Sequence, residues 1–333
     1  MKKGIYKFIA TFLFTVTSIT IVFAENKTVE SDGFNPTPYI LHHIADSYEW
    51  HLWGSVSIPL PVILYTDGHI DIFMSSLFDH GHAEVERGER TYTLDSHGHV
   101  VEKSGLAVYD FSITKNVAAM FVSLILLLFL FISAGRIAKK SFGKTPSGLL
   151  AFLEPLVVFV RDDIIIPNMG VKHHKKYLPY LMTVFFFIFI NNLLGLVPGG
   201  ANVTGNIAVA LVLSFLTLII TNLSGNKNYW KHIFLPNVPL ALYPLMVPIE
   251  VVGVLTKPFA LMIRLFANIT AGHIIILSLI SLIFVFESLF VAPVSVGFVL
   301  FMNTLELLVA ALQAYIFTLL SALFIGQAVQ EHH

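Results

Sequence analysis

The sequence has no cysteine, few charged residues and no phosphate-binding glycine motif. Without cysteine, this 333-residue chain has no disulfides, thiolate metal sites or cysteine nucleophiles. It also has no P-loop and no cluster of metal-binding carboxylates, so the chain itself offers no site for phosphate chemistry. Charged residues make up 12% and the formal net charge is −1, which does not indicate nucleic-acid binding. We therefore expect no catalytic site, no cofactor, no bound metal and no nucleic-acid partner.

Apolar residues dominate what is present. They make up 56% of the chain, phenylalanine alone occurs 29 times, and the mean hydropathy is +0.77. Soluble globular domains do not have this composition. The sequence predicts an all-α polytopic membrane protein embedded in a lipid bilayer.

The first 24 residues have the pattern of a secretory signal. Lys2, Lys3 and Lys7 form a basic start, an apolar stretch runs from Phe8 to Phe23, and Ala24 offers a small residue for cleavage. An uncleaved anchor helix is the alternative. Both interpretations place the following segment, residues 25–112, outside the cytoplasm.

Residues 25–112 form a polar extension rich in histidine, and we expect them to be a small extracytoplasmic module. Eight of the fourteen histidines lie here: His42, His43, His51, His69, His80, His82, His97 and His99. Two pairs with i, i+2 spacing would suit a metal on an extended strand, but solvated loop histidines are the favoured interpretation. The runs "IPLPVILYTDGHIDIF" and "RTYTLDSHGHVVEK" predict hairpins with turns at Asp-Gly and His-Gly.

Three membrane spans are predicted before residue 240, at about 113–134, 177–197 and 203–223. Basic residues follow the first and third spans and precede the second, in the stretch "GVKHHKKY", which reads as a cytoplasmic loop. The stretch at about 146–166 is apolar but interrupted by charges, so it predicts a helix lying at the cytoplasmic interface.

The last two apolar runs are too long for upright spans. They cover about residues 243–286 and 294–326, and the second would be roughly 50 Å long against a hydrocarbon core of roughly 30 Å. We therefore expect a steeply tilted antiparallel hairpin, giving about five transmembrane helices in all. Its turn would lie outside, near Glu287 and Pro293, and the C-terminus would lie in the cytoplasm.

This hairpin contains most of the polar residues at membrane depth. Ionisable side chains in hydrocarbon cost several kcal/mol unless they face protein, water or a partner charge, so their concentration indicates an ion path. Two pairs, Arg264 with Gln313 and His273 with Glu306, fall into nearly one antiparallel register. Asn268 shares a helix face with Arg264, whereas His273 lies about half a revolution away.

The segments "KPFALMIRLFANITAGHIII" and "LELLVAALQAYIFTLLSALF" resemble the two signature helices of subunit a of the F-type ATP synthase. The resemblance covers about residues 113–330, and we assign residues 113–333 to one membrane domain. The segment "NNLLGLVP" also resembles an earlier helix of the family. The resemblance implies a membrane stator facing a rotating ring of c subunits. The other implied partners are the b-subunit peripheral stalk and the remaining ATP synthase subunits.

The resemblance also implies residue roles in proton translocation. Arg264 matches the stator arginine, whose permanent charge attracts a c-ring carboxylate and blocks a direct leak between two half-channels. His273 and Glu306 match the ionisable pair of the outer half-channel, and Glu250 matches an inner carboxylate. Asn268 and Gln313 match the polar residues that flank the arginine. Lys257, which precedes this helix segment, is not expected to be functional.

Several alternatives stay open at this point. A sodium-translocating version of the same subunit would have the same signature helices, although the titratable His273 favours protons. An unrelated secondary transporter would show inverted repeats, and the sequence has no second copy of the "RLFAN" helix. The expected location is the bacterial inner membrane, with the N-terminal region outside.

Overall fold

The computed structural model describes residues 36–53, 56–81, 83–95, 98–140, 145–197, 199–235, 239, 242–286 and 290–330. For residues 39, 41–43, 53 and 80 it describes the backbone alone. The expected signal peptide, the turn residue Glu287 and the last three residues therefore lie outside the described part.

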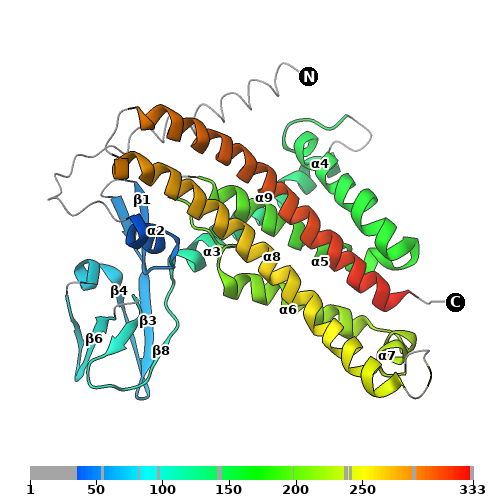
Figure 1. Cartoon of the computed structure of the whole chain (residues 1–333), viewed down its shortest axis with the longest axis horizontal. Coiled ribbons are helices and arrows are strands. Elements are labelled where there is room, and N and C mark those ends of the chain that lie inside the picture. The colour runs from blue at the N-terminus through cyan, green and yellow to red at the C-terminus, as the bar shows by residue number, and fades with distance from the viewer. Residues whose placement is uncertain are drawn as a thin grey trace. The chain divides into compact units, whose positions relative to one another are not determined.

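Beyond residue 114 the described chain is mostly helical (Figure 1). The elements are α3 (Lys115–Lys140), α4 (Leu149–Phe159), the π-helical η2 (Val160–Ile165), α5 (Ile166–Gly195), α6 (Ile207–Ser224), α7 (Lys227–Phe234), α8 (Tyr243–Phe286) and α9 (Val291–Val329). Among the described helices, α3, α6, α8 and α9 are long and apolar enough to cross a membrane. A predominantly helical, polytopic membrane protein is confirmed.

The shorter predicted spans correspond to α3, α6 and the second part of α5. Helix α5 is two helical segments joined at a kink, where Gly170 adopts φ 73° and ψ 163°. The basic stretch after Gly170 was predicted to be a loop, and that prediction is wrong, because residues 171–177 are helical. Lysine is a good helix former, so a run of basic residues can be helical on an exposed surface.

The stretch predicted to be an interfacial helix is helical and consists of α4 followed by η2. Together these elements cover residues 149–165, close to the predicted stretch 146–166. Pro155 lies inside α4, and Arg161 forms an ion pair with its neighbour Asp162 at 2.7 Å in η2. The charges that excluded an upright span are thus on exposed side chains, Glu154 in α4 and Arg161, Asp162 and Asp163 in η2.

Helices α8 and α9 are the longest elements, with 44 and 39 residues. At 1.5 Å per residue they measure about 66 Å and about 59 Å, roughly twice the thickness of a hydrocarbon core. Helix α8 continues through Pro248 and Pro258 without a break. Such lengths fit a bilayer only if the helices are strongly inclined or extend beyond the hydrocarbon.

The N-terminal module is rich in β-strands. After α2 (Pro36–Ile44) come β1 (Glu49–Trp53), β2 (Val56–Pro59), β3 (Pro61–Thr66), β4 (His69–Met74), the short helix η1 (Ser75–Gly81), β5 (Val85–Arg87), β6 (Arg90–Leu94), β7 (Val100–Glu102) and β8 (Val108–Asp110). They form three small antiparallel sheets with strand orders β1-β2, β4-β3-β8 and β5-β6-β7. The module's core includes Val62, Leu64, Phe73, Phe78 and Tyr92.

Both predicted hairpins are confirmed. In the first, Thr66 of β3 pairs with His69 of β4, and Asp67 and Gly68 between them have φ values of 49° and 80°. Two successive positive φ angles define the type I′ turn that the Asp-Gly pair favours. In the second hairpin, which joins β6 to β7, the amide of Gly98 donates to the carbonyl of Asp95 at 3.0 Å.

The chain divides into two compact units, and each draws on distant parts of the sequence. The first unit is Met1–Val122, Leu194–Val203 and His273–Asn303. It combines the β-rich module with the connection between α5 and α6 and with the adjoining ends of α8 and α9. The second unit is Ser123–Leu193, Thr204–Gly272 and Thr304–His333, and it contains most of the helical residues.

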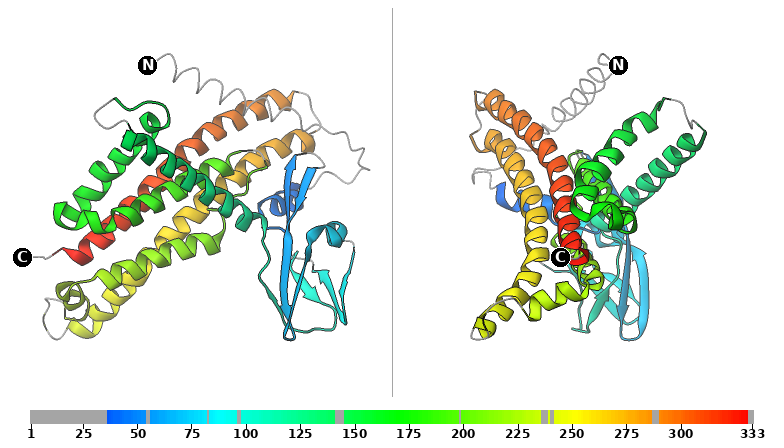
Figure 2. Two further views of the ribbon diagram at one scale, coloured as in Figure 1. Left: turned by 180° about the vertical axis from the view of Figure 1, so that it is seen from behind. Right: turned by 90° about the vertical axis from the view of Figure 1, so that its right-hand side faces the viewer.

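Within each unit, α8 and α9 pack as antiparallel neighbours (Figure 2). In the first unit, the hydroxyl of Ser295 donates to the carbonyl of Leu279. In the second unit, the ammonium of Lys257 donates to the side chain of Gln327 at 3.5 Å. The predicted antiparallel pairing of the two long helices is therefore present in the structure.

Helix α9 also packs closely against α5 within the second unit. The amide of Asn192 donates to the carbonyl of Ala310 at 3.1 Å, and Asn192 accepts a hydrogen bond from Thr204. Nearer the end of α9, Gly326 lies against the carbonyl of Asn168, where an added Cβ would come within 2.1 Å of that oxygen. Small and amide side chains thus allow close helix packing, as is usual in membranes.

Candidate functional site

Arg264 and Asn268 lie on an exposed face of α8. Their neighbours Leu261, Leu265 and Ile269 are buried against the rest of the second unit. The helical repeat of about 100° per residue turns the arginine and the asparagine, four residues apart, roughly a quarter turn away from the middle of this buried face. Within the described part of the chain, no hydrogen bond or ion pair involves Arg264. A permanent positive charge within a membrane-length apolar helix is thus presented outward.

Glu306 of α9 is buried, with 5% of the residue exposed. It lies against Gly272 of α8, where an added Cβ would come within 2.9 Å of the Glu306 Oε1 atom and 3.2 Å of its Cδ. The absence of a side chain at Gly272 therefore makes room for the carboxylate beside the backbone of α8. The antiparallel register predicted from the sequence included Glu306, but it gave no role to Gly272.

His273 follows Gly272 and belongs to the first unit. Its Nε2 atom lies 3.2 Å from the carbonyl oxygen of Gly195, in the connection between α5 and α6. Because a carbonyl only accepts, Nε2 carries the hydrogen in this contact. This contact sets the tautomer and the orientation of the ring.

Glu250 lies near the start of α8 and is partly buried, with 29% of its side chain exposed. His232 of α7 approaches it with Nδ1 at 4.0 Å from the carboxylate. The sequence analysis considered the residues after the third span only for their positive charge and did not predict the proximity of His232 to Glu250. The residue spacing contains no signal for it, because only the fold of α7 against α8 brings the two side chains together.

The other polar residues of the hairpin have different surroundings. Gln313 of α9 is almost fully buried, with 2% exposed. Among the described residues, no hydrogen bond joins it to Arg264. Lys257 contacts Gln327, and its ammonium lies 5.2 Å from the centre of the Phe324 ring. Lys257 is therefore held by the end of α9.

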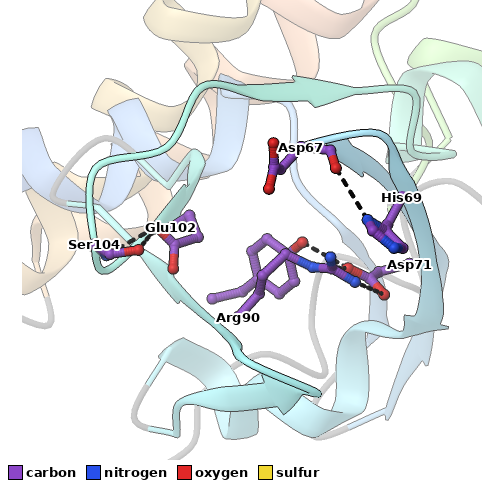
Figure 3. A network of polar contacts seen from close by, with 7 residues as sticks. Asp67, His69, Asp71, Arg90, Glu102 and Ser104 are labelled. Atoms are coloured by element: carbon purple, nitrogen blue, oxygen red, sulfur yellow. Dashed lines mark hydrogen bonds and ion pairs between the residues drawn. The ribbon is translucent and has the colours of Figure 1, made fainter.

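The β-rich module contains a separate polar network (Figure 3). Arg90 donates two hydrogen bonds to the Asp71 carboxylate at 2.8 and 3.1 Å, and the Tyr92 hydroxyl donates a third at 2.7 Å. Burial acts to raise the pKa of Asp71, but the hydrogen bonds from Arg90 and Tyr92 hold that pKa below its ordinary value. Nearby, Ser104 donates to Glu102 and lowers the pKa of that carboxyl.

No group of three or more histidine, aspartate or glutamate side chains that could hold a metal occurs among the described residues. The paired histidines of the module fall partly outside that range, since His82 and His97 are not described and only the backbone of His80 is. In the first hairpin, His69 donates from Nδ1 to the carbonyl of Asp67 at 2.9 Å, which is a local turn contact.

Two family models match the chain, one to each part. Residues 117–326 match the model of the ATP synthase A chain, and residues 39–118 match a domain of unknown function. The first match covers α3 through most of α9, and the second covers the β-rich module.

Curated relatives support the first match. ATP synthase subunit a 2 of Chlorobaculum tepidum is 46% identical over 275 residues, which are 74% of this chain and 78% of the relative. ATP synthase subunit a of Chloroherpeton thalassium is 47% identical, covering 66% and 68% of the two chains. ATP synthase subunit a of an Anaeromyxobacter species is 40% identical, covering 88% and 70%. The chain therefore belongs to the ATP synthase subunit a family.

Proposed function

We propose that Arg264, His273 and Glu306 carry the central steps of proton translocation in this ATP synthase subunit. As a family member, the chain is the ion-channel stator of the membrane sector and has no catalytic site of its own. Family membership does not favour an unrelated secondary transporter. The titratable His273 supports protons over sodium as the transported ion.

The observation that carries the proposal is the exposed position of Arg264. A charged side chain at membrane depth is costly unless it meets water or a charge on a partner. The outward face shared with Asn268 suits a partner that presents a carboxylate, for which we propose the c-subunit ring. Arginine stays charged throughout the relevant pH range, so it keeps the approaching carboxylate ionised and blocks direct proton passage.

Protons reach the ring through an outer half-channel that includes His273 and Glu306. The contact with Gly195 orients the ring of His273, and Gly272 admits the Glu306 carboxylate beside α8. After one passage of the rotor, protons leave by an inner half-channel at Glu250, near His232. Gln313 and Asn268 provide the polar groups that flank the arginine in the translocation path.

We further propose the arrangement of the whole subunit. Residues 1–24 are a signal peptide, residues 25–112 an extracytoplasmic module, and residues 113–333 the membrane domain of a bacterial inner-membrane protein. The N-terminal region lies outside and the C-terminus in the cytoplasm. The b-subunit peripheral stalk is the second partner, since a stator must be held against the torque of the rotor.

Arg264→Ala tests the proposal in inverted membrane vesicles that contain the complete ATP synthase. We expect ATP-driven proton pumping to be lost while the complex remains assembled. Arg161→Ala is the matched control, because Arg161 is an exposed arginine already paired with Asp162, and we expect it to pump normally. Coupled pumping by Arg264→Ala at the rate of the unchanged protein would contradict the stator role of this residue.

A further inference from the structure

The β-rich module contacts the connection between α5 and α6, and this connection accepts a hydrogen bond from His273. The indole Nε1 of Trp50, in β1, donates to the carbonyl of Gly199 at 2.7 Å. Gly199 belongs to the connection between α5 and α6. This connection, strand β1 and the part of α8 that begins at His273 all lie in the first unit. The same connection supplies the Gly195 carbonyl that accepts from His273. Only three residues separate these two glycines, so both contacts bear on one short loop, residues 194–203.

The backbone of this loop makes the contact with β1 very close. Gly199 has φ +77°, and a Cβ added there would lie 2.3 Å from the carbonyl oxygen of Leu52. Glycine is therefore required twice, once by the left-handed backbone and once by the approach of β1. The strand and the loop are fitted together through backbone atoms, which leave less freedom than side-chain contacts.

The loop itself is tightly folded, so a contact at one end constrains the other. The amide of Val197 donates to the carbonyl of Leu194 at 3.2 Å, and the amide of Gly200 donates to that of Val197 at 2.7 Å. Ala201 and Val203 are buried, with 2% and 1% exposed. Ala201 and Asn202 also lie next to Gly195, within 4 Å of the position of an added Cβ.

The module end of this contact is fixed as well. Just before β1, the carbonyl of Ser47 accepts from the amide of Lys115 at 2.8 Å, and Asp46 accepts from the hydroxyl of Thr114 at 2.7 Å. Tyr48 donates to Asp110 of β8. Burial and this hydrogen bond raise the pKa of Tyr48, so its phenol remains a donor. The start of β1 is thus tied to the start of helix α3.

We infer that the β-rich module is a clamp for the proton-uptake path, in which Trp50 is a positioning residue that acts on His273 through the loop 194–203. The module holds the loop, the loop holds the Gly195 carbonyl, and that carbonyl orients the imidazole. This inference rests on the proposed role of His273. It assigns a task to the part of the chain that matches a domain of unknown function.

The first test measures the clamp without reference to proton transport. A single cysteine is introduced as Ala201→Cys, and its reaction with a water-soluble maleimide is followed in the assembled complex, made from partner subunits that also lack cysteine. Removing the Trp50 hydrogen bond with Trp50→Phe, or separating the backbones with Gly199→Ala, should raise the labelling rate about fivefold. Gly88→Ala is the control, because Gly88 has a similar φ of +61° with no neighbour near an added Cβ. Unchanged labelling in both loop variants would overturn the inference.

The second test asks whether Trp50 acts through His273. Passive proton conduction is measured in vesicles stripped of the catalytic sector for Trp50→Phe, His273→Gln and the double variant. We expect Trp50→Phe alone to slow conduction about fivefold. In the His273→Gln background the same substitution should cause no further loss. Trp50→Tyr, which keeps a hydrogen-bond donor, should conduct faster than Trp50→Phe. An equal loss in both backgrounds would overturn the inference, because it would show a general structural effect.

The two proposals can fail separately. If His273→Gln conducts protons normally, the proposed uptake role of His273 is wrong, whereas the labelling result still decides whether the module holds the loop. If His273→Gln blocks conduction but Trp50→Phe changes neither labelling nor conduction, the clamp is wrong and the proposed function stands.

Discussion

At the scale of single residues, glycines determine where the polar groups of this protein can lie. Gly272 leaves space for the Glu306 carboxylate, and Gly199 admits the backbone of β1. Neither role follows from the residue type alone, since a glycine can also lie where an added side chain would contact nothing. Both are defined by atoms from another part of the chain that would occupy the place of a Cβ.

Gly272→Ala should impair proton transport without preventing assembly. The new methyl group would lie within 3.0 Å of the Glu306 carboxylate, whose flexible end must then move away. Because small displacements of reacting groups have large kinetic effects, we expect roughly a tenfold loss of ATP-driven pumping. Gly253→Ala, in the same helix but with no neighbour near the added Cβ, is the control. Equal pumping by the two variants would mean that the position of Glu306 is not critical.

At the scale of elements, the module's strands are held together by a polar centre as well as an apolar core. Asp71 on β4 accepts hydrogen bonds from Arg90 and Tyr92 on β6, which belongs to a different sheet. The network therefore joins two of the three sheets. Such a contact stabilises the module only while the carboxyl is ionised.

Tyr92→Phe should lower the stability of the module by about 1–2 kcal/mol near neutral pH, since a buried hydrogen bond to a charged group is lost. The pKa of Asp71 lies below its ordinary value of 3.8 in the folded state. Its contribution is therefore present above that pH and is lost as the pH falls through the folded-state pKa.

Hydrogen exchange of the β6 amides in the full-length subunit, from pH 3 to pH 7, measures this effect. The difference between Tyr92→Phe and the unchanged protein should shrink below about pH 4. Tyr109→Phe serves as the control, because Tyr109 is an exposed residue of β8. A difference that persists undiminished at pH 3 would show that the Asp71 carboxylate does not carry the stabilisation.

At the scale of the whole molecule, the proposed topology places the β-rich module and α7 on opposite sides of the membrane. The natural absence of cysteine makes this testable by labelling single introduced cysteines. Glu89→Cys, in an exposed turn of the module, should react with an impermeant maleimide in right-side-out vesicles. Asn228→Cys, exposed on α7, should react only in inverted vesicles. Labelling of both from one side would refute the proposed orientation.

Much of the architecture could be predicted from local patterns. Apolar runs predicted α3, α6, α8 and α9, and the Asp67-Gly68 pair predicted a hairpin turn, because each signal depends on neighbours along the chain. The basic stretch after Gly170 was mistaken for a loop because charge marks exposure and membrane side, not backbone conformation. The roles of Arg264, Asn268 and Gln313 in ion translocation stay predictions.

The sequence by itself determined the membrane class, the long helical hairpin with its polar residues, and the family. These properties follow from composition, periodicity and motif spacing, which can be read without knowing which distant residues are in contact. The tertiary structure alone decided that Glu306 lies against Gly272, that His232 approaches Glu250, and that Trp50 contacts the loop beside His273. Those contacts join residues from 18 to 149 positions apart, and only the packing of the elements on one another determines which of many possible pairs meet.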